Sequence, residues 1–298
     1  MNNVQKIIKE ICDELDIKFS LISQNWIMVL EQEEKIKYVV GYKFPLNDQA
    51  SGKICDDKYA LYEVLKKFNI PIIEHYIIHK NYDKKQIIEN CNNYNNDMVI
   101  KTNLGTCGNG VYHKINTEEI FNTIDNLLID NISISLCPYY DIKTEYRTIV
   151  LNNEAELVYG KIKPIVYGDG IKTIYELLLD FNKSYFENIE CIDELKKVLK
   201  KDEVYEYNWQ FNLSKGAMPF ILEDKTFETQ IRDIAIKVSK ILGVKFASID
   251  IIELTNGNLL VLEANSGVMM SNFSVDLANG KDIAKSIYTK VIKELFNK

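Results

Sequence analysis

The sequence predicts a mixed α+β fold built on antiparallel sheets. Segments with helical periodicity alternate with short strand-like runs along the whole chain. The dipeptide Asn256-Gly257 separates two apolar runs, 247–254 and 259–263, and this pattern is the strongest short-range indication of a β-hairpin. The 298 residues contain no internal repeat or low-complexity linker and have room for two or three modest domains.

The individual elements follow from local patterns. Residues 1–16 place their apolar side chains on one helical face. A helix at 56–68 ends before Asn69-Ile70-Pro71, because a residue that precedes proline avoids the α region. Thr173 and Glu176 form a capping-box pattern for a short helix ending near residue 179. The same reasoning predicts helices at 84–92, 117–128, 182–205, 226–242 and from about 282, and strands at 26–31, 37–43, 72–78, 98–101, 132–136, 145–151 and 156–163.

Composition excludes several classes of protein. The formal net charge of −7 argues against a general nucleic-acid binder, which needs a basic surface. No apolar run is long enough to span a bilayer, and the N-terminus lacks the apolar core of a signal peptide, so we expect a cytoplasmic chain with no membrane partner. The six cysteines form no CxxC pair and no metal-binding spacing with histidine, which favours reduced, packed thiols.

The predicted hairpin carries the first candidate site. Asp250 interrupts the apolar run of one arm, and Glu263 and Asn265 end the other arm. Residues two apart in a strand point to the same face, so Glu263 and Asn265 lie together. Oxygen donors of this kind suit Mg²⁺ or Mn²⁺ and do not suit zinc. The alternative is that these polar side chains simply face water at the strand ends.

A glycine-rich stretch forms the second candidate site. Lys101 is followed by Gly105, Gly108 and Gly110 in a chain with only 13 glycines. Glycine lets backbone N–H groups approach phosphate oxygens, and a nearby lysine neutralises their charge. The stretch matches neither a P-loop nor a Rossmann fingerprint, so a mobile hairpin tip is an equal alternative. Cys107, inside the stretch, is either a reactive thiol or a small residue tolerated in a tight loop.

The third candidate set consists of cations. Only two of the 36 basic residues are arginine, Arg147 and Arg232, so a retained arginine draws attention to its planar, five-donor fork. Arg147 and Lys161 lie in consecutive predicted strands, and Lys215 follows later in NLSKGA. Most single lysines are solvated surface residues, and this remains the alternative for Lys161 and Lys215.

In this order the motifs resemble those of the ATP-grasp superfamily, closest to its peptide-ligase branch, which includes ribosomal-protein S6 glutamate ligases, cyanophycin synthetase and bacterial glutathione synthetases. The resemblance covers roughly residues 52–275. The matching stretches are DDKYALYEVLKKFNIPI, MVIKTNLGTCGNGV, PYYDIKTEYRTIVL, YGKIKPIVYGDGIKTIYELL, NLSKGA and SIDII with VLEANSG. The fold implied has two antiparallel-sheet α+β subdomains that clasp ATP, at 52–136 and 137–298, after a reduced N-terminal α/β segment at 1–51.

The resemblance also implies a role for each candidate residue. Lys58 and Lys101 would contact the nucleotide, and the loop with Gly105, Gly108 and Gly110 would close over its phosphates. The remaining implied roles are the adenine hinge (Cys137, Tyr139, Tyr140), the ribose contact (Glu145), the groups around the transferred phosphoryl (Arg147, Lys161, Lys215, Asn212) and the metal ligands (Asp250, Glu263, Asn265).

The function implied is that of an ATP-dependent carboxylate–amine ligase that forms an amide bond through an acylphosphate. ATP and Mg²⁺ or Mn²⁺, with two ions, would be required, and an amino acid or short peptide would be the substrate. Similar proteins are commonly dimers, so a homodimer is one expected assembly. Two alternatives remain: a regulatory or carboxylate-kinase relative without ligase activity, and a natural-product peptide-tailoring ligase that recognises its peptide through residues 182–205.

Overall fold

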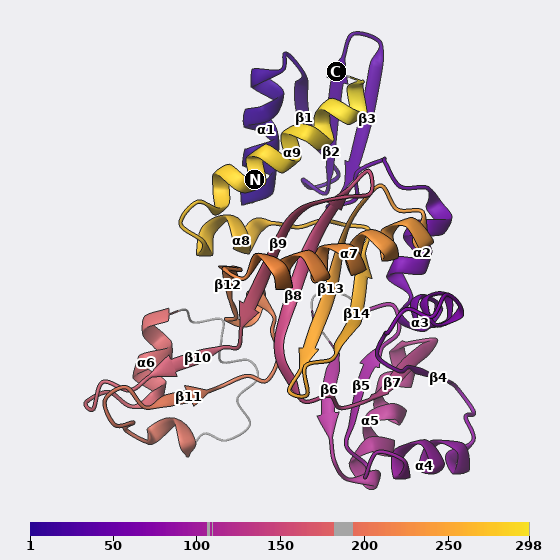
Figure 1. Ribbon diagram of the computed structural model, residues 1–298, viewed down its shortest axis with the longest axis vertical. Helices are drawn as coiled ribbons and strands as arrows, with labels where there is room; N and C mark the ends of the chain where they lie inside the picture. Colours follow the sequence, from indigo (N-terminus) through magenta and orange to yellow (C-terminus); the bar gives the residue numbers. More distant parts are fainter. Residues whose placement is uncertain (106–107, 109, 182–192, 298) are drawn as a thin grey trace.

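The computed structural model describes residues 1–105, 108, 110–181 and 193–297, and these have the predicted α+β architecture (Figure 1). Within this part of the chain all pairings between named strands are antiparallel. The helices are α1 (Asn3–Glu14), α2 (Gln49–Asp56), α3 (Lys58–Lys67), α4 (Lys84–Asn92), α5 (Thr117–Asp130), α6 (Ile174–Phe181), α7 (Lys225–Leu242), α8 (Ser271–Asp276) and α9 (Gly280–Phe296). The strands are β1 (Lys18–Ile22), β2 (Ile27–Gln32), β3 (Lys35–Val40), β4 (Tyr76–His79), β5 (Met98–Thr102), β6 (Val111–Lys114), β7 (Ser133–Pro138), β8 (Ile142–Leu151), β9 (Glu154–Ile162), β10 (Ile165–Tyr167), β11 (Val204–Glu206), β12 (Met218–Ile221), β13 (Phe246–Leu254) and β14 (Leu259–Asn265).

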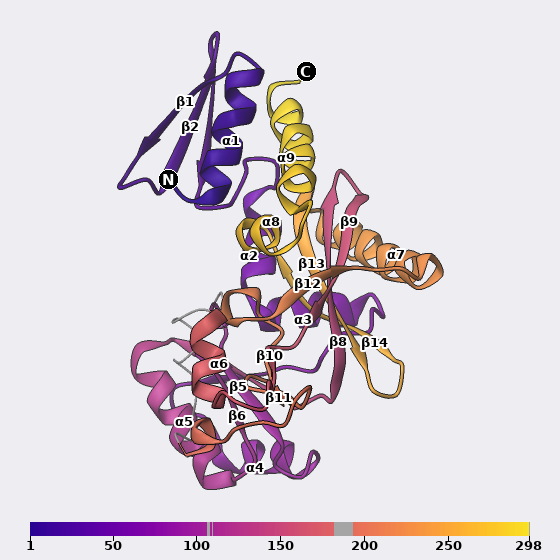
Figure 2. The ribbon, with the colours of Figure 1, turned by 90° about the vertical axis from the view of Figure 1, so that its left-hand side faces the viewer.

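The two ends of the chain share one core. Helix α1 covers the three-stranded sheet β1-β2-β3, and α9 runs beside α1 (Figure 2). Ile7 and Ile11 of α1 belong to the same buried cluster as Tyr288 and Ile292 of α9. The N-terminal segment is therefore anchored by the C-terminal helix, because burying apolar side chains from both ends stabilises both.

The central sheet has five strands in the order β12-β9-β8-β13-β14. Helix α7 covers one face of this sheet, where Ile231 and Val238 share a buried cluster with Val150 and Ile249. Strand β13 is buried along almost its whole length. Asp250 stands in the middle of that strand, so its carboxylate must find charged partners on a neighbouring strand.

A four-stranded sheet, β4-β7-β5-β6, forms the other large layer, with α4 and α5 packed on one of its faces. Strands β10 and β11 form a small two-stranded antiparallel sheet, and α6 packs against it. The domain limits expected at 51/52 and 136/137 fall inside α2 and β7, and they remain predictions. None of the helices in the described ranges combines the length and the apolar character that crossing a membrane requires.

Three predicted elements need correction. The helix expected at 56–68 is present as α3 but begins at Lys58, because the side chain of Asp57 caps it by accepting from the Ala60 N–H at 2.9 Å. The strand expected from residue 72 begins only at Tyr76. The chain before it pairs with β14 instead, because the Val261 N–H donates to the Pro71 carbonyl at 2.9 Å.

The third correction concerns the helix expected at 182–205. Its described part, 193–205, holds a 3₁₀ turn (Glu194–Lys196) and most of strand β11, and no α-helix. Pairing with β10 explains the difference, because Val204 lies opposite Tyr167 and the ladder hydrogen bonds replace helical ones. Residues 182–192 lie outside the described residues. The capping box of Thr173 and Glu176 is confirmed by reciprocal hydrogen bonds.

Candidate active site

Four charged side chains meet on one face of the central sheet. Sheet register sets them opposite each other in pairs: Arg147 of β8 faces Asp250 of β13, and Glu145 of β8 faces Lys161 of β9. Arg147 uses its fork, with Nε 2.7 Å from Oδ1 and Nη2 2.5 Å from Oδ2 of Asp250. Lys161 donates to Glu145, and its Nζ also lies 3.5 Å from Oδ1 of Asp250.

Burial and pairing set the protonation of this network. Asp250 is completely buried. Burial alone would raise the pKa of Asp250, but Arg147 and then Lys161 outweigh it and hold the pKa below its usual range. Burial raises the pKa of Glu145 above its usual range, and Lys161 offsets only part of this effect. Asp250 is therefore a fixed anion, whereas Glu145 is more easily protonated than an ordinary glutamate.

The predicted metal ligands lie together at the end of the hairpin. Glu263 of β14 pairs directly with Asp250, and its Oε1 is 3.8 Å from Nη2 of Arg147. Asn265 donates its side-chain amide N–H to Glu263 at 3.1 Å, so its amide oxygen is the atom that would coordinate an ion. The Glu263 side chain is 37% exposed, so solvent reaches its oxygens.

The donor chemistry of these three residues fits a hard divalent cation, since two carboxylates and an amide supply only oxygen. In the described ranges no group of three or more histidine, cysteine, aspartate or glutamate side chains could hold a metal. A metal site here consequently depends on the amide of Asn265 as well as on the two carboxylates. Because Arg147 already binds both oxygens of Asp250, an ion would share that carboxylate with the arginine.

The two predicted nucleotide lysines lie close to this cluster. Lys58, the first residue of α3, donates to the carbonyls of Asn103 at 3.3 Å and Gly105 at 2.6 Å. Burial, and after it the charge of Lys101 on β5, lower the pKa of Lys58 to about 8. Glu263 acts in the opposite direction on the same pKa. Charges from both large sheets thus act on one another across the site.

The glycine-rich stretch touches a third set of candidates. Lys215 donates to the Gly108 carbonyl at 2.9 Å and to the Gln210 side chain at 2.8 Å. Gly108 has φ +68°, and a Cβ there would lie 2.7 Å from the Asn212 amide nitrogen. The loop therefore needs glycine at this position both for its backbone conformation and for its close contact with Asn212. Cys107 lies outside the described residues.

The predicted hinge directs its side chains into the protein. Cys137 is buried, and the Tyr140 hydroxyl accepts from the Glu74 N–H at 3.1 Å. The ring of Tyr139 stacks on His113 at 4.1 Å between centroids and lies 5.9 Å from Trp209. An adenine contact through the backbone of this hinge is compatible with these positions and remains a prediction.

The comparison with known families decides the assignment. A model of the RimK-like ATP-grasp domain matches residues 55–163 and 196–291, which is more than half of the chain. The chain belongs to this family. The resemblance inferred from the motifs is confirmed.

Curated relatives of this RimK-like ATP-grasp chain are ligases by name. Cyanophycin synthetase of Geminocystis herdmanii is 25% identical over 272 residues, which cover 80% of this chain and 30% of that protein. A probable alpha-L-glutamate ligase of Desulfotalea psychrophila is 41% identical over 64 residues, or 22% of this chain and 13% of that protein. The chain thus spans less than a third of the length of either relative.

Solved structures share the fold. The bifunctional glutathione synthetase of Pasteurella multocida aligns with a TM-score of 0.62 at 17% identity, over 100% of this chain and 44% of that one. The D-alanine–D-alanine ligase of Bacillus anthracis aligns with a TM-score of 0.59 at 13% identity, over 84% of this chain and 69% of that one. The predicted α+β ATP-grasp fold is confirmed.

One feature of this ATP-grasp site was not predicted from the sequence. His113 and Trp209 join Tyr139 in an aromatic cluster beside the hinge, and Trp209 is one of only two tryptophans, a signal that could have been used. Arg232, the second arginine, lies elsewhere. It donates through Nε and Nη2 to Glu228 at 2.8 and 2.6 Å and through Nη1 to the Ala155 carbonyl, joining α7 to β9.

Proposed function

We propose that this ATP-grasp domain is an ATP-dependent carboxylate–amine ligase. A carboxylate oxygen of the donor attacks the γ-phosphorus of ATP, the bond to ADP breaks, and an acylphosphate forms. An amine nitrogen then attacks the acyl carbon and phosphate leaves, which completes the amide bond. The observation that carries this proposal is the paired network of Arg147, Asp250, Lys161 and Glu145 in a chain of the RimK-like family.

The proposed reaction needs alignment and charge neutralisation more than a covalent nucleophile. Arg147 suits this role, because its side chain is 20% exposed and its fork is fixed by Asp250. Lys161 is almost completely buried and neutralises Glu145 and Asp250 in this conformation. We assign Arg147 to the donor carboxylate and transferred phosphoryl group, and Lys161 to the same charge network directly behind it.

Lys58, Lys101 and Lys215 would surround the phosphate chain. Lys58 and Lys215 donate to backbone carbonyls of the glycine-rich loop. A phosphate oxygen is a stronger acceptor than a carbonyl, because a charge-assisted hydrogen bond is roughly twice as strong as a neutral one. We therefore propose that Lys58 and Lys215 leave the loop carbonyls and bind phosphate oxygens when the nucleotide is present. We assign Gly105, Gly108 and Gly110 to this loop, which would also exclude water from the acylphosphate.

Asp250, Glu263 and Asn265 are the residues that would hold Mg²⁺ or Mn²⁺. Such ions supply neutralisation of the charge on the phosphate oxygens. Glu145, bonded to Lys161 in the buried network, is assigned to the ribose side of the site, and the backbone at Cys137, Tyr139 and Tyr140 to the adenine. Asn212, whose side-chain oxygen accepts from Ser214 N–H at 2.9 Å, would position the substrate end of the loop.

The substrate class is an amino acid or short peptide, in keeping with the names of the relatives. The test is an ADP-release screen over amino acids and dipeptides with Mg²⁺-ATP, with hydroxylamine added in parallel. A carboxylate that forms an acylphosphate gives a hydroxamate, and a suitable amine gives an amide with release of ADP and phosphate. ATP binding with no ADP release, hydroxamate or amide across the panel would instead support a nucleotide-binding relative without ligase activity.

A further inference from the structure

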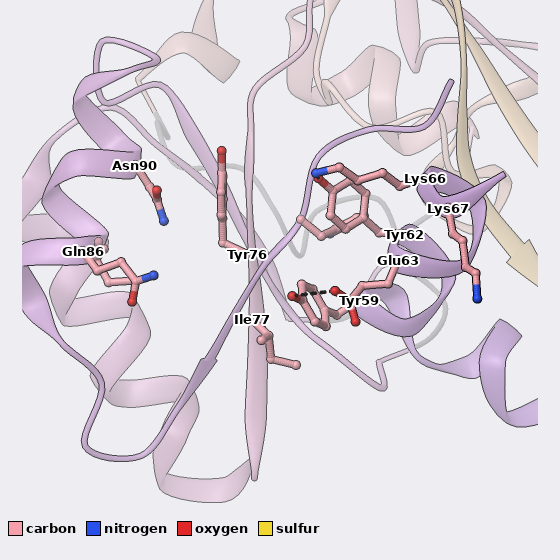
Figure 3. A pocket seen from close by; sticks show the side chains of 11 residues that line it. Tyr59, Tyr62, Glu63, Lys66, Lys67, Tyr76, Ile77, Gln86 and Asn90 are labelled. Carbon is pink, nitrogen blue, oxygen red and sulfur yellow. Dashed lines mark hydrogen bonds between the residues drawn. The ribbon is translucent and has the colours of Figure 1, made fainter. Parts of the chain in front are cut away.

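A cavity of about 520 Å³ is lined by none of the candidate site residues, although Tyr59 in its wall directly follows Lys58 in α3. Helix α3 forms one wall, helix α4 forms the other, and strand β4 lies between them. Figure 3 shows Tyr59, Tyr62 and Lys66 on the α3 side of β4, and Gln86 and Asn90 on the α4 side. The cavity is therefore a groove that follows β4.

The floor of this groove is the edge of a sheet. In the described part of the chain β4 pairs with β7 alone, and it is the outermost strand of the order β4-β7-β5-β6. Alternate residues of an edge strand turn their N–H and C=O groups away from the sheet, where they can pair with an added strand. Tyr76 and Ile77 of β4 both line the groove. An extended peptide would thus find backbone partners here.

The walls of the groove favour an acidic peptide. Two lysines and one glutamate are among its lining residues, whereas the whole chain has a net charge of −7. The glutamate, Glu63, accepts a hydrogen bond from the Tyr59 hydroxyl at 3.2 Å. Lys66 donates to the Tyr62 hydroxyl at 2.7 Å and lies over the ring of Tyr62, while Lys67 is exposed. The α3 wall consequently carries two lysines and one glutamate, a net charge of +1, on an aromatic surface.

The opposite wall has a different character. Gln86 and Asn90 of α4 supply side-chain amides, and the buried, apolar Ile87 of the same helix also lines the groove. Side chains of an added strand point alternately to the two faces of the sheet. Acidic side chains would then face α3, and small apolar or amide side chains would face α4.

We propose that the groove between α3 and α4 binds an extended acidic peptide segment, which adds as a strand to the free edge of β4. Backbone pairing supplies affinity in this mode of recognition, and the two walls supply specificity. None of the lining residues is assigned to the active centre, and the proposal does not depend on the ligase activity proposed above.

The experiment uses the full chain and a fluorescent peptide of alternating glutamate and valine, with anisotropy as the measurement. We expect saturable binding that weakens about tenfold in the double variant Lys66→Glu, Lys67→Glu. The matched control is Lys237→Glu, Lys240→Glu, which makes the same charge change on exposed positions of α7 and should leave binding unchanged. Equal weakening in both variants would overturn the proposal, because it would show general charge attraction.

Two further measurements test the strand itself. Peptide binding should slow amide hydrogen exchange in residues 76–79, and methylation of alternate peptide nitrogens should abolish binding because it removes the donors that pair with β4. Equal affinity of the methylated peptide would refute strand addition. A concentration-dependent dimer that the Lys66→Glu, Lys67→Glu variant dissolves, with no peptide binding, would also overturn the proposal and assign the groove to a second copy of this chain.

Discussion

The substitution Arg147→Lys tests the fork at the centre of the site. Arg147 donates to both oxygens of Asp250, at 2.7 and 2.5 Å, and Asp250 is completely buried. Lysine keeps the positive charge but offers one nitrogen at its tip, so it cannot make two parallel hydrogen bonds in this geometry. The variant therefore isolates the shape of the arginine from its charge.

The magnitude follows from the lost contact. A hydrogen bond to a charged group contributes about 1.5–3 kcal/mol, and water cannot replace it at a buried carboxylate. We expect the free energy of unfolding to fall by about 2 kcal/mol in Arg147→Lys. Arg147→Met should lower the free energy of unfolding further, by about 3–5 kcal/mol, because Asp250 would lose its main partner. The remaining contact of Asp250 with Lys161 would reduce this loss.

Urea unfolding gives the change in stability, and initial rates over a range of ATP concentrations give kcat and KM. Turnover should fall far more than ATP affinity, since Arg147 is assigned to the reacting end of the site. The control is Arg232→Lys, which removes the contact of two arginine nitrogens with Oε1 of Glu228 within α7 but should leave kcat unchanged. Wild-type stability and turnover in Arg147→Lys would refute the reasoning and make Arg147 an ordinary surface residue.

Three other predictions concern the neighbouring groups. Glu263→Gln should abolish Mg²⁺-dependent turnover without loss of fold, measured by Mg²⁺ titration and circular dichroism; full activity would exclude Glu263 as a ligand. ATP affinity should decline as the pH rises through about 8, because the Lys58 pKa is lowered to that value and the cation is lost above it, and Lys58→Arg should remove this dependence in a calorimetric titration. Gly108→Ala should reduce turnover strongly with a nearly unchanged Tm, because its Cβ would meet the Asn212 amide at 2.7 Å, and normal turnover would show that the loop does not need this contact.

Much of the fold, and the order of the site motifs along the chain, could be predicted because the relevant sequence patterns are local. The Asn256-Gly257 hairpin was predicted from its turn residues, and its register then set Asp250 opposite Glu263. The partnership of Asp250 with Arg147 could not be predicted in the same way, since 103 residues separate them and only the pairing of β8 with β13 brings them together. Tertiary pairing likewise overrode the helical pattern around Val204.

The scarcity of arginine shows what such a signal can predict. Both arginines donate two hydrogen bonds to a carboxylate: Arg147 binds both oxygens of Asp250, and Arg232 directs two nitrogens to Oε1 of Glu228. Scarcity therefore identified positions where the geometry of arginine is used, and it did not separate a candidate catalytic position from a structural one. Burial of the carboxylate and the neighbouring metal-ligand candidates make that distinction, and both depend on the fold.

The cations that we assign to ATP already have partners in the protein. Lys58 and Lys215 bind loop carbonyls, while Arg147 and Lys161 bind buried carboxylates. Nucleotide binding is then an exchange of partners for the two lysines, because their carbonyl bonds are neutral at one end and phosphate bonds are not. The arginine and the buried lysine keep their carboxylates, since breaking either pair would leave an uncompensated charge in the sheet. Nucleotide binding should consequently change the contacts of Lys58 and Lys215 and leave the central sheet in place.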